Sequence, residues 1–247
     1  MLKLAVENVS KSYGKEDVIK DISIKLEKGE IVSVIGPSGV GKTTLFNVIS
    51  GLLAPDSGRV VLDGEDISGV CGRVSYMLQK DLLLQHKTVL ESAALPLLIK
   101  GEKKSEALKK ADSYFGVFNI EGTQGKYPDQ LSGGMRQRVA LLRTYLFSKE
   151  VALLDEPFSA LDAITKGNMH SWYMEVMKEI KLTTLFITHD IDEALMLSDR
   201  IYIMTGNPGR IEKELTIDIE KPRSEDFLWS DEFALYKKYI MKLLKAD

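Results

Sequence analysis

The chain has 247 residues, of which 44% are hydrophobic and 28% are charged, and its formal net charge at pH 7 is −3. These values are ordinary for a globular protein with one large domain, and they exclude a basic tail or arm built for nucleic acid. The single cysteine, Cys71, excludes an internal disulfide framework and fits a reducing compartment.

Neither an export signal nor a membrane-spanning segment is expected. Residues 1–8 lack the long apolar core of a signal peptide, and no apolar run approaches the about 18 residues that span a bilayer. If the protein works at a membrane, we therefore expect another chain to hold it there.

The first part of the chain predicts several short strands. Residues 2–9 and 18–26 show rough apolar alternation, which is typical of two paired strands. After a helix near residue 45, a turn at 55–58 leads into a strand over 59–62, and Asp63-Gly64 is a hairpin signal. Residues 74–77 predict one more strand.

From residue 80 to about 130 the pattern changes to helix. Thr88 to Lys100 predicts a helix interrupted by Pro96, and Lys103 to Phe115 predicts a second helix rich in Lys, Glu, Ala and Leu. We interpret this stretch as a helical subdomain inserted into an α/β core.

Beyond residue 130, long helical patterns alternate with short apolar strands. Val151 to Leu154 and Thr184 to Thr188 each follow a helical pattern, which indicates βαβ units and a parallel sheet. Ile201 to Met204 predicts a further strand, Ile211 to Ile219 alternates, and Phe227 to Lys245 predicts an amphipathic helix.

Together these elements predict one α/β domain over residues 1–247. Its α/β core, with a mostly parallel sheet and an N-terminal antiparallel β portion, would comprise residues 1–79 and 131–225. The helical subdomain, 80–130, would continue into the next helix, and 226–247 would form a C-terminal helix.

A glycine-rich loop joins the apolar strand at 31–35 to the first helix. Gly36 and Gly41 bracket four residues and precede Lys42 and Thr43, which is the P-loop pattern. Glycines let backbone N–H groups turn toward a phosphate, Lys42 would reach the β- and γ-phosphates, and the Thr43 hydroxyl would ligate Mg²⁺. The loop therefore predicts a bound nucleoside triphosphate with its metal, and it predicts that the α/β core is a P-loop NTPase core. A ligand-free glycine turn is the alternative.

Polar residues also follow two of the predicted parallel strands, at the edge where open α/β sheets bind ligands. Asp155 and Glu156 follow the strand at 151–154, and we expect Asp155 to hold Mg²⁺ and Glu156 to act as general base toward a water. His189 follows the strand at 184–188, where it could hydrogen-bond the γ-phosphate or that water. A solvated turn and a structural histidine are the alternatives.

A second anion cradle is predicted at residues 132–134. Ser132 can cap a helix whose first turn offers free N–H groups, and Gly133 and Gly134 allow close approach of a phosphate. One nucleotide does not need two unrelated cradles on the same phosphate face, so we expect a partner copy to supply this one. The sequence thus predicts two ATP molecules sandwiched in a head-to-tail, two-fold homodimer.

In order and spacing, these motifs resemble those of an ATP-binding subunit of an ABC transporter, over essentially the full chain. Leu131–Gln137 resembles the family signature, Leu153–Glu156 the end of the Walker B motif, Ser159–Asp162 the D-loop, and His189 the switch histidine. The Walker A resemblance covers Gly36, Pro37, Ser38, Gly39, Val40, Gly41, Lys42, Thr43 and Thr44.

The resemblance implies further site residues. Tyr13 would stack on adenine, although an aromatic at a strand end is the alternative. Gln79 would contact Mg²⁺ and the water, joining Glu156 and His189 in catalysis and signalling to the membrane partner; a polar loop residue is the alternative. Asp162 would link the two sites across the dimer.

Within the family, residues 131–141, 155–163, 188–195 and 207–211 resemble the nitrate/sulfonate/taurine-type importer branch. That branch often has a Pro-Trp pair soon after the Gln79 region, where this chain has Gln-His-Lys at 85–87. This departure lies on a surface expected to face the permease, and it leaves the solute open.

The resemblance implies an ATPase using ATP and Mg²⁺. A homodimer would sit in the cytoplasm against the inner face of the membrane and drive uptake through an integral-membrane permease, with a solute-binding protein acting indirectly and no nucleic acid. An exporter subunit is the closest alternative. A soluble ABC ATPase of DNA repair or ribosomes usually has a coiled-coil insertion or two nucleotide domains, which this chain lacks. A scaffold that binds nucleotide without turnover is a further alternative, and the presence of Asp155, Glu156 and His189 argues against it.

Overall fold

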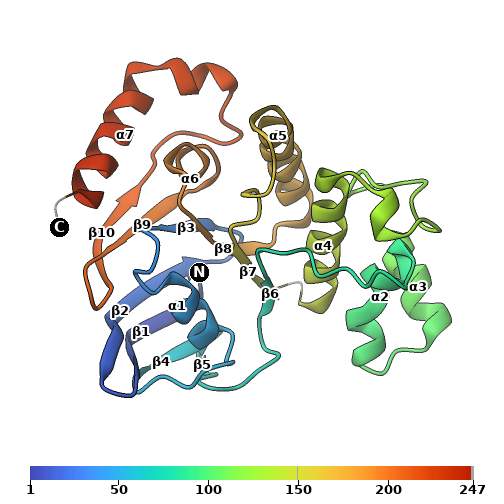
Figure 1. Cartoon of the computed structure of the whole chain (residues 1–247), viewed down its shortest axis with the longest axis horizontal. Helices are drawn as coiled ribbons and strands as arrows, with labels where there is room; N and C mark the ends of the chain where they lie inside the picture. The colour runs from blue at the N-terminus through green and yellow to red at the C-terminus, as the bar shows by residue number, and fades with distance from the viewer. Residues whose placement is uncertain (149, 246–247) are drawn as a thin grey trace.

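The computed structural model describes residues 1–148 and 150–245. Its smaller sheet is antiparallel, in the order β2-β1-β4-β5, and confirms the N-terminal β portion (Figure 1). The strands predicted over 2–9 and 18–26 run further than expected, because their pairing continues to Tyr13 and Glu16 beside the connecting turn. The bounds are β1 Leu2–Tyr13, β2 Glu16–Glu27, β4 Ser57–Leu62 and β5 Glu65–Asp66.

The larger sheet has the order β10-β9-β3-β8-β7-β6, and only the β9–β10 pair is antiparallel, so the mostly parallel sheet is confirmed. Its central strands are buried on both faces, which explains their continuous apolar runs. The bounds are β3 Ile31–Ile35, β6 Ser75–Met77, β7 Val151–Asp155, β8 Thr183–Thr188, β9 Arg200–Thr205 and β10 Arg210–Thr216.

The register of the parallel strands brings three predicted motifs to one edge. Ile35 of β3 pairs with Thr188 of β8, and Asp155 of β7 pairs with Ile187 of β8. The P-loop, the Asp155-Glu156 pair and His189 therefore leave the sheet at the same end.

Helices cover both faces of the larger sheet. Helix α1 packs in one apolar core between the two sheets, whereas α2 to α5 share a second core on the opposite face (Figure 1). Helices α6 and α7 cover the β9 side. The bounds are α1 Lys42–Ile49, α2 Val89–Ile99, α3 Lys104–Asp112, η1 Pro128–Gln130, α4 Gly133–Phe147, α5 Ala163–Ile180, α6 Ile191–Leu197, η2 Glu225–Trp229 and α7 Asp231–Leu244.

The predicted interruption at Pro96 is wrong, because α2 runs through this residue. A proline inside a helix removes one hydrogen bond and costs about 3 kcal/mol. A complete capping box of Thr88 and Glu91 and the burial of Ala93 and Leu97 offset that loss. Tertiary packing thus overrides the local signal.

The single helix predicted over 227–245 is also wrong. A short 3₁₀ turn, η2, ends at Trp229, and α7 begins after Ser230, whose hydroxyl accepts the N–H of Phe233 at 3.1 Å. Serine is a strong helix N-cap, so it starts a new helix here. Residues 246–247 of the predicted C-terminal segment lie outside the described residues.

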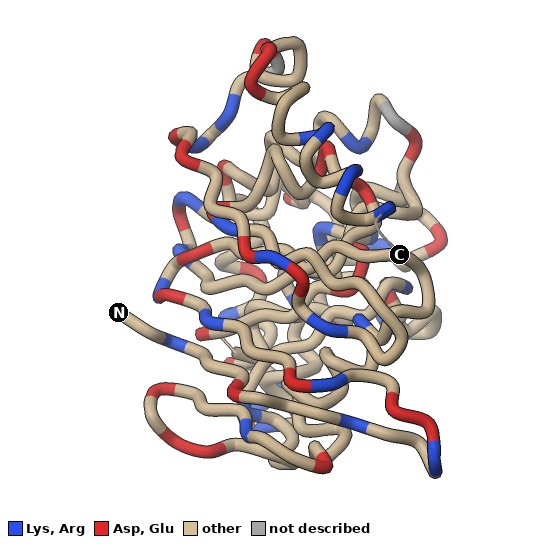
Figure 2. Tube along the Cα trace, turned by 90° about the vertical axis from the view of Figure 1, so that its left-hand side faces the viewer, with Lys and Arg blue, Asp and Glu red and all other residues tan. Residues whose placement is uncertain are grey.

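Across residues 1–148 and 150–245, we find no helix with both the length and the apolarity to cross a bilayer. Basic and acidic positions are intermixed along the trace (Figure 2). This mixture is what a chain with 33 Lys and Arg against 36 Asp and Glu leads one to expect.

Candidate functional site

The P-loop closes around the side chain of Lys42. Gly39 and Gly41 have φ values of +84° and +103°, in the left-handed region that glycine adopts without strain. The Lys42 ammonium group donates to the carbonyl oxygens of Gly36 at 2.7 Å and Pro37 at 2.9 Å. The loop therefore places a cation where its backbone and the start of α1 form an anion site.

Lys42 also faces the acidic pair that ends β7. Burial lowers the pKa of Lys42, while the charges of Glu156 and Asp155 act in the opposite direction. The parallel register described above is what brings these residues together, although they are more than 110 positions apart in the sequence.

Asp155 lies in an electrostatically costly position. Burial and the nearby charge of Glu156 raise the pKa of Asp155, and the opposing effects of Tyr76 and Lys42 do not cancel this. The Tyr76 hydroxyl donates to Asp155 Oδ2 at 3.4 Å. A carboxylate held this way is stabilised by a bound cation.

The chemistry of the predicted donor set suits Mg²⁺. The Thr43 hydroxyl, the Gln79 amide oxygen and the Asp155 carboxylate are hard oxygen donors, which Mg²⁺ prefers. Among the described residues, no three His, Cys, Asp or Glu side chains gather into a metal cage. A site with a single carboxylate fits Mg²⁺, which keeps water and takes phosphate oxygens from its substrate.

Glu156 is held between two of the other predicted catalytic residues. Its Oε1 lies 3.1 Å from His189 Nδ1, and its Oε2 accepts a hydrogen bond from Gln79 Nε2 at 3.2 Å. Gln79 Nε2 lies 3.3 Å from Ser159 Oγ as well. Glu156 has a φ of +47°, and its N–H donates to Ile187 of β8 at 3.0 Å, so its backbone is fixed in a strained conformation.

Ser132 caps α4 as predicted, since its Oγ accepts the N–H of Met135 at 3.3 Å. Strands β8, β7 and β6 lie between the P-loop strand β3 and α4, which contacts β6. The P-loop lies at the start of α1 and the cradle at 132–134 lies at the start of α4, so the two are separate sites within one chain (Figure 1).

Tyr13 is half exposed at the end of β1, just before the turn that leads to Glu16. A cavity of about 550 Å³ lies next to this turn. It is lined by Glu16, Pro37, Ser38, Gly39, Val40, Gly206 and Asn207. Tyr13 itself does not line it, and Glu16 and Asn207 are polar neighbours of the P-loop that sequence reasoning missed.

The turn between β9 and β10 packs directly on the P-loop. Gly209 donates its N–H to Val18 at 2.9 Å, and its carbonyl accepts from Lys20 at 3.0 Å. A Cβ atom on Gly209 would lie 2.0 Å from the Val40 carbonyl oxygen. The run Gly206-Asn207-Pro208-Gly209 is typical of a turn, but no sequence signal shows which loop it contacts.

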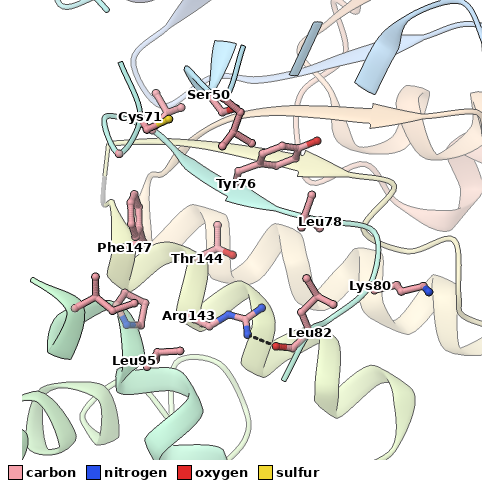
Figure 3. A pocket seen from close by; sticks show the side chains of 15 residues that line it. Ser50, Cys71, Tyr76, Leu78, Lys80, Leu82, Leu95, Arg143, Thr144 and Phe147 are labelled. Carbon is pink, nitrogen blue, oxygen red and sulfur yellow. Dashed lines mark hydrogen bonds between the residues drawn. The ribbon is translucent and has the colours of Figure 1, made fainter. Parts of the chain in front are cut away.

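An apolar groove of about 380 Å³, which the sequence did not predict, lies between β6, α2 and α4 (Figure 3). Its exposed apolar side chains include Leu82 and Ile99, and Arg143 Nη1 donates to the Leu82 carbonyl at 2.9 Å. Its other lining residues include Leu52, Cys71, Tyr76, Leu78, Lys80, Leu95, Thr144 and Phe147. Leu78 and Lys80 flank Gln79 in the sequence, so the groove borders one of the predicted catalytic residues.

The comparisons with known proteins agree with this geometry. Residues 19–159 match the family model described as ABC transporter. The formylaminopyrimidine import ATP-binding protein ThiZ of Halalkalibacterium halodurans is 42% identical over 98% of this chain and 96% of its own length. The aliphatic sulfonates import ATP-binding protein SsuB of Bacillus cereus is 36% identical over 98% and 95%.

Solved structures agree as well. A dimeric ATP-binding cassette in a post-hydrolysis state, bound to ADP and phosphate, superposes with a TM-score of 0.72. The two chains are 28% identical, over 88% of this chain and 100% of that one.

Proposed function

Because this chain belongs to the ABC transporter family, as an ATP-hydrolysing subunit of the importer type, we propose that it drives uptake of a small solute through a separate membrane permease. The observation that carries the hydrolysis on which this uptake would depend is the Glu156 carboxylate, held between Gln79 and His189 at the edge where the P-loop strand also ends.

ATP would bind with its phosphates in the P-loop, residues 36–44. The loop N–H groups and the positive end of α1 would receive the phosphate oxygens, and Lys42 would exchange its bonds to Gly36 and Pro37 for bonds to the β- and γ-phosphates. Tyr13, exposed at the end of β1, would stack on the adenine.

Hydrolysis would depend on Glu156 and its two neighbours. Glu156 would orient a water and take up its proton, Gln79 would hold the carboxylate from one side, and His189 would contact the γ-phosphate from the other. Thr43, Gln79 and Asp155 would hold Mg²⁺, which neutralises phosphate charge when bound.

We further propose that the working form is a homodimer. Ser132, Gly133 and Gly134 form a capped helix start away from the P-loop of their own chain, so in a head-to-tail pair they would face the nucleotide of the partner. Asp162, at the start of α5, would lie beside the partner site.

The apolar groove is the proposed permease contact. It exposes Leu82 and Ile99 to solvent, and its wall includes Leu78 and Lys80 on either side of Gln79. An apolar helical segment of the permease seated there would touch the same loop that binds Glu156. Solute movement and ATP hydrolysis would then be coupled through residues 78–82, at the cytoplasmic face of the membrane.

For the solute, we propose a small sulfur- or nitrogen-containing compound, delivered by a separate solute-binding protein. Support comes from the relatives, whose names refer to import of formylaminopyrimidine and of aliphatic sulfonates. Because both names refer to import, they argue against the alternative of an exporter subunit.

Purified protein tests the proposal in two steps. ATP hydrolysis with Mg²⁺ should be measurable and should be lost in Lys42→Ala, because the phosphates lose their cation. The chain should then co-purify with a permease, and the solute should raise turnover in the reconstituted complex. Turnover without any permease association would contradict the transport function.

A further inference from the structure

A cluster of charged side chains joins α5 to α6 behind the catalytic residues. Lys166 and His170 lie on the first two turns of α5, and Asp190 and Glu193 lie at the start of α6. Lys166 Nζ is 2.5 Å from Asp190 Oδ2 and 3.4 Å from Glu193 Oε2. His170 Nε2 is 3.9 Å from the same Glu193 oxygen.

The contact with Lys166 meets two electrostatic needs at once. The N-terminal end of a helix carries partial positive charge, so a lysine in the first turn of α5 needs nearby anions. The Glu193 side chain is only 2% exposed, and a buried carboxylate needs a cation. Burial tends to lower the pKa of Lys166, but the bond to Asp190 and the charge of Glu193 outweigh it and raise the pKa.

Asp190 links this cluster to the switch histidine. Its Oδ1 accepts the N–H groups of Asp192 and Glu193 at 2.9 and 3.2 Å, which caps α6, while its Oδ2 binds Lys166. His189 is the residue directly before Asp190. The position of His189 is therefore set by β8 on one side and, through Asp190, by α5 on the other.

Helix α5 in turn follows the loop that begins with Glu156. Helices α5 and α6 lie side by side (Figure 1). Two contacts therefore join the segment 156–166 to the segment 189–190: Glu156 contacts His189, and Lys166 binds Asp190. A shift of α6 away from α5 would carry His189 away from the Glu156 carboxylate.

We propose that Lys166 is a positioning residue that holds His189 against Glu156 by tying α6 to α5. The proposal rests on the function proposed above for Glu156 and His189. It adds a residue that would touch neither the nucleotide nor the water that attacks the γ-phosphate.

Three variants test it. Lys166→Met removes the charge, Lys166→Arg keeps a cation, and Lys237→Met is the matched control, because Lys237 on α7 binds Asp192 of the same helix α6 at 2.6 Å without reaching α5. The readouts are the ring-nitrogen NMR signals of His189, assigned with His189→Ala, and kcat and KM for ATP.

Lys166→Met should shift the His189 signals and lower kcat about 10-fold, with KM for ATP changed by less than about 2-fold. Lys166→Arg should restore both, and Lys237→Met should leave both unchanged. In the His189→Ala background, Lys166→Met should reduce the residual turnover no further, because the residue it positions is gone.

Unmoved His189 signals in Lys166→Met would overturn the proposal, as would an equal loss of turnover with and without His189. A wild-type protein without ATP turnover would contradict the proposed function instead. The NMR signals would still decide whether Lys166 positions His189, because they do not depend on turnover.

Discussion

His189 Nδ1 lies 3.1 Å from Glu156 Oε1, and the two residues follow the neighbouring parallel strands β8 and β7. The sheet register enforces this contact, because Asp155 pairs with Ile187 and the chain continues one residue to Glu156 and two to His189. The carboxylate is held in place while His189 remains largely exposed at the site. This arrangement suits a site in which Glu156 receives a water and His189 receives a phosphate, both entering from solvent.

Glu156→Gln should leave ATP binding intact and lower turnover at least about 100-fold, because the amide cannot take a proton from water. Since hydrolysis would reopen the dimer, the variant should accumulate as a dimer with Mg-ATP. Phosphate release and light scattering during size exclusion measure the two effects. Turnover at the wild-type rate would remove Glu156 from the mechanism.

Asp155→Asn should stabilise the protein in the absence of nucleotide. Burial and Glu156 raise the pKa of Asp155, so between the unfolded and folded pKa values the folded state binds more protons and stability falls as pH rises. Above that window the penalty is fully present. At neutral pH we expect a higher free energy of unfolding than in the wild type, with the gain shrinking toward acid pH, together with loss of Mg-dependent turnover.

Urea unfolding at several pH values measures this effect, with Asp218→Asn as the matched control on an exposed carboxylate. A less stable Asp155→Asn protein at neutral pH, compared with both wild type and control, would contradict the electrostatic account of this position.

Gly209→Ala should weaken ATP binding from outside the P-loop. The new Cβ would lie 2.0 Å from the Val40 carbonyl oxygen, so the loop or the β9–β10 turn must move, at a cost of about 1–3 kcal/mol. Calorimetric titration with ATP and thermal melting measure the two consequences. Gly125→Ala, where a Cβ atom meets open space, is the control, and equal behaviour of the two variants would show that the turn does not support the loop.

Ile99→Lys should separate ATP hydrolysis from permease binding. Ile99 lines the apolar groove and is 72% exposed, so a lysine there would place a charge against an apolar partner without disturbing the core. Leu235→Lys, at a 68% exposed leucine of α7, is the matched control. Co-purification should be lost only in Ile99→Lys, with ATPase activity unchanged in both; equal retention of the permease would exclude the groove.

Local sequence signals were sufficient to predict the functional residues that come directly after a strand. The glycine spacing before Lys42 and the carboxylates after Leu154 predict an edge of a parallel sheet, and the register places them there. Ser132 likewise caps α4 as its residue type predicts, since capping depends only on neighbouring N–H groups.

The sequence failed where distant segments meet. Packing against α4 keeps α2 helical through Pro96, and the contact of Gly209 with Val40 joins residues that no local pattern relates. The apolar groove is built from β6, α2, α4 and the loops beside them, so no single stretch of sequence predicts it. In the C-terminal segment, Ser230 is a local capping signal, and it ends the continuous helix that the periodicity of residues 227–245 predicts.

Cross-linking tests most directly whether two copies share each nucleotide. One chain would carry Ser38→Cys and the other Ser132→Cys, both exposed positions, with Cys71→Ser and Glu156→Gln in each chain. Each of the two chains then has one cysteine. When the chains are mixed, a short bis-maleimide can therefore join position 38 to position 132 only between molecules. We predict a covalent dimer of the two chains that forms with Mg-ATP and not without it. Absence of that mixed dimer at saturating Mg-ATP would contradict the shared site.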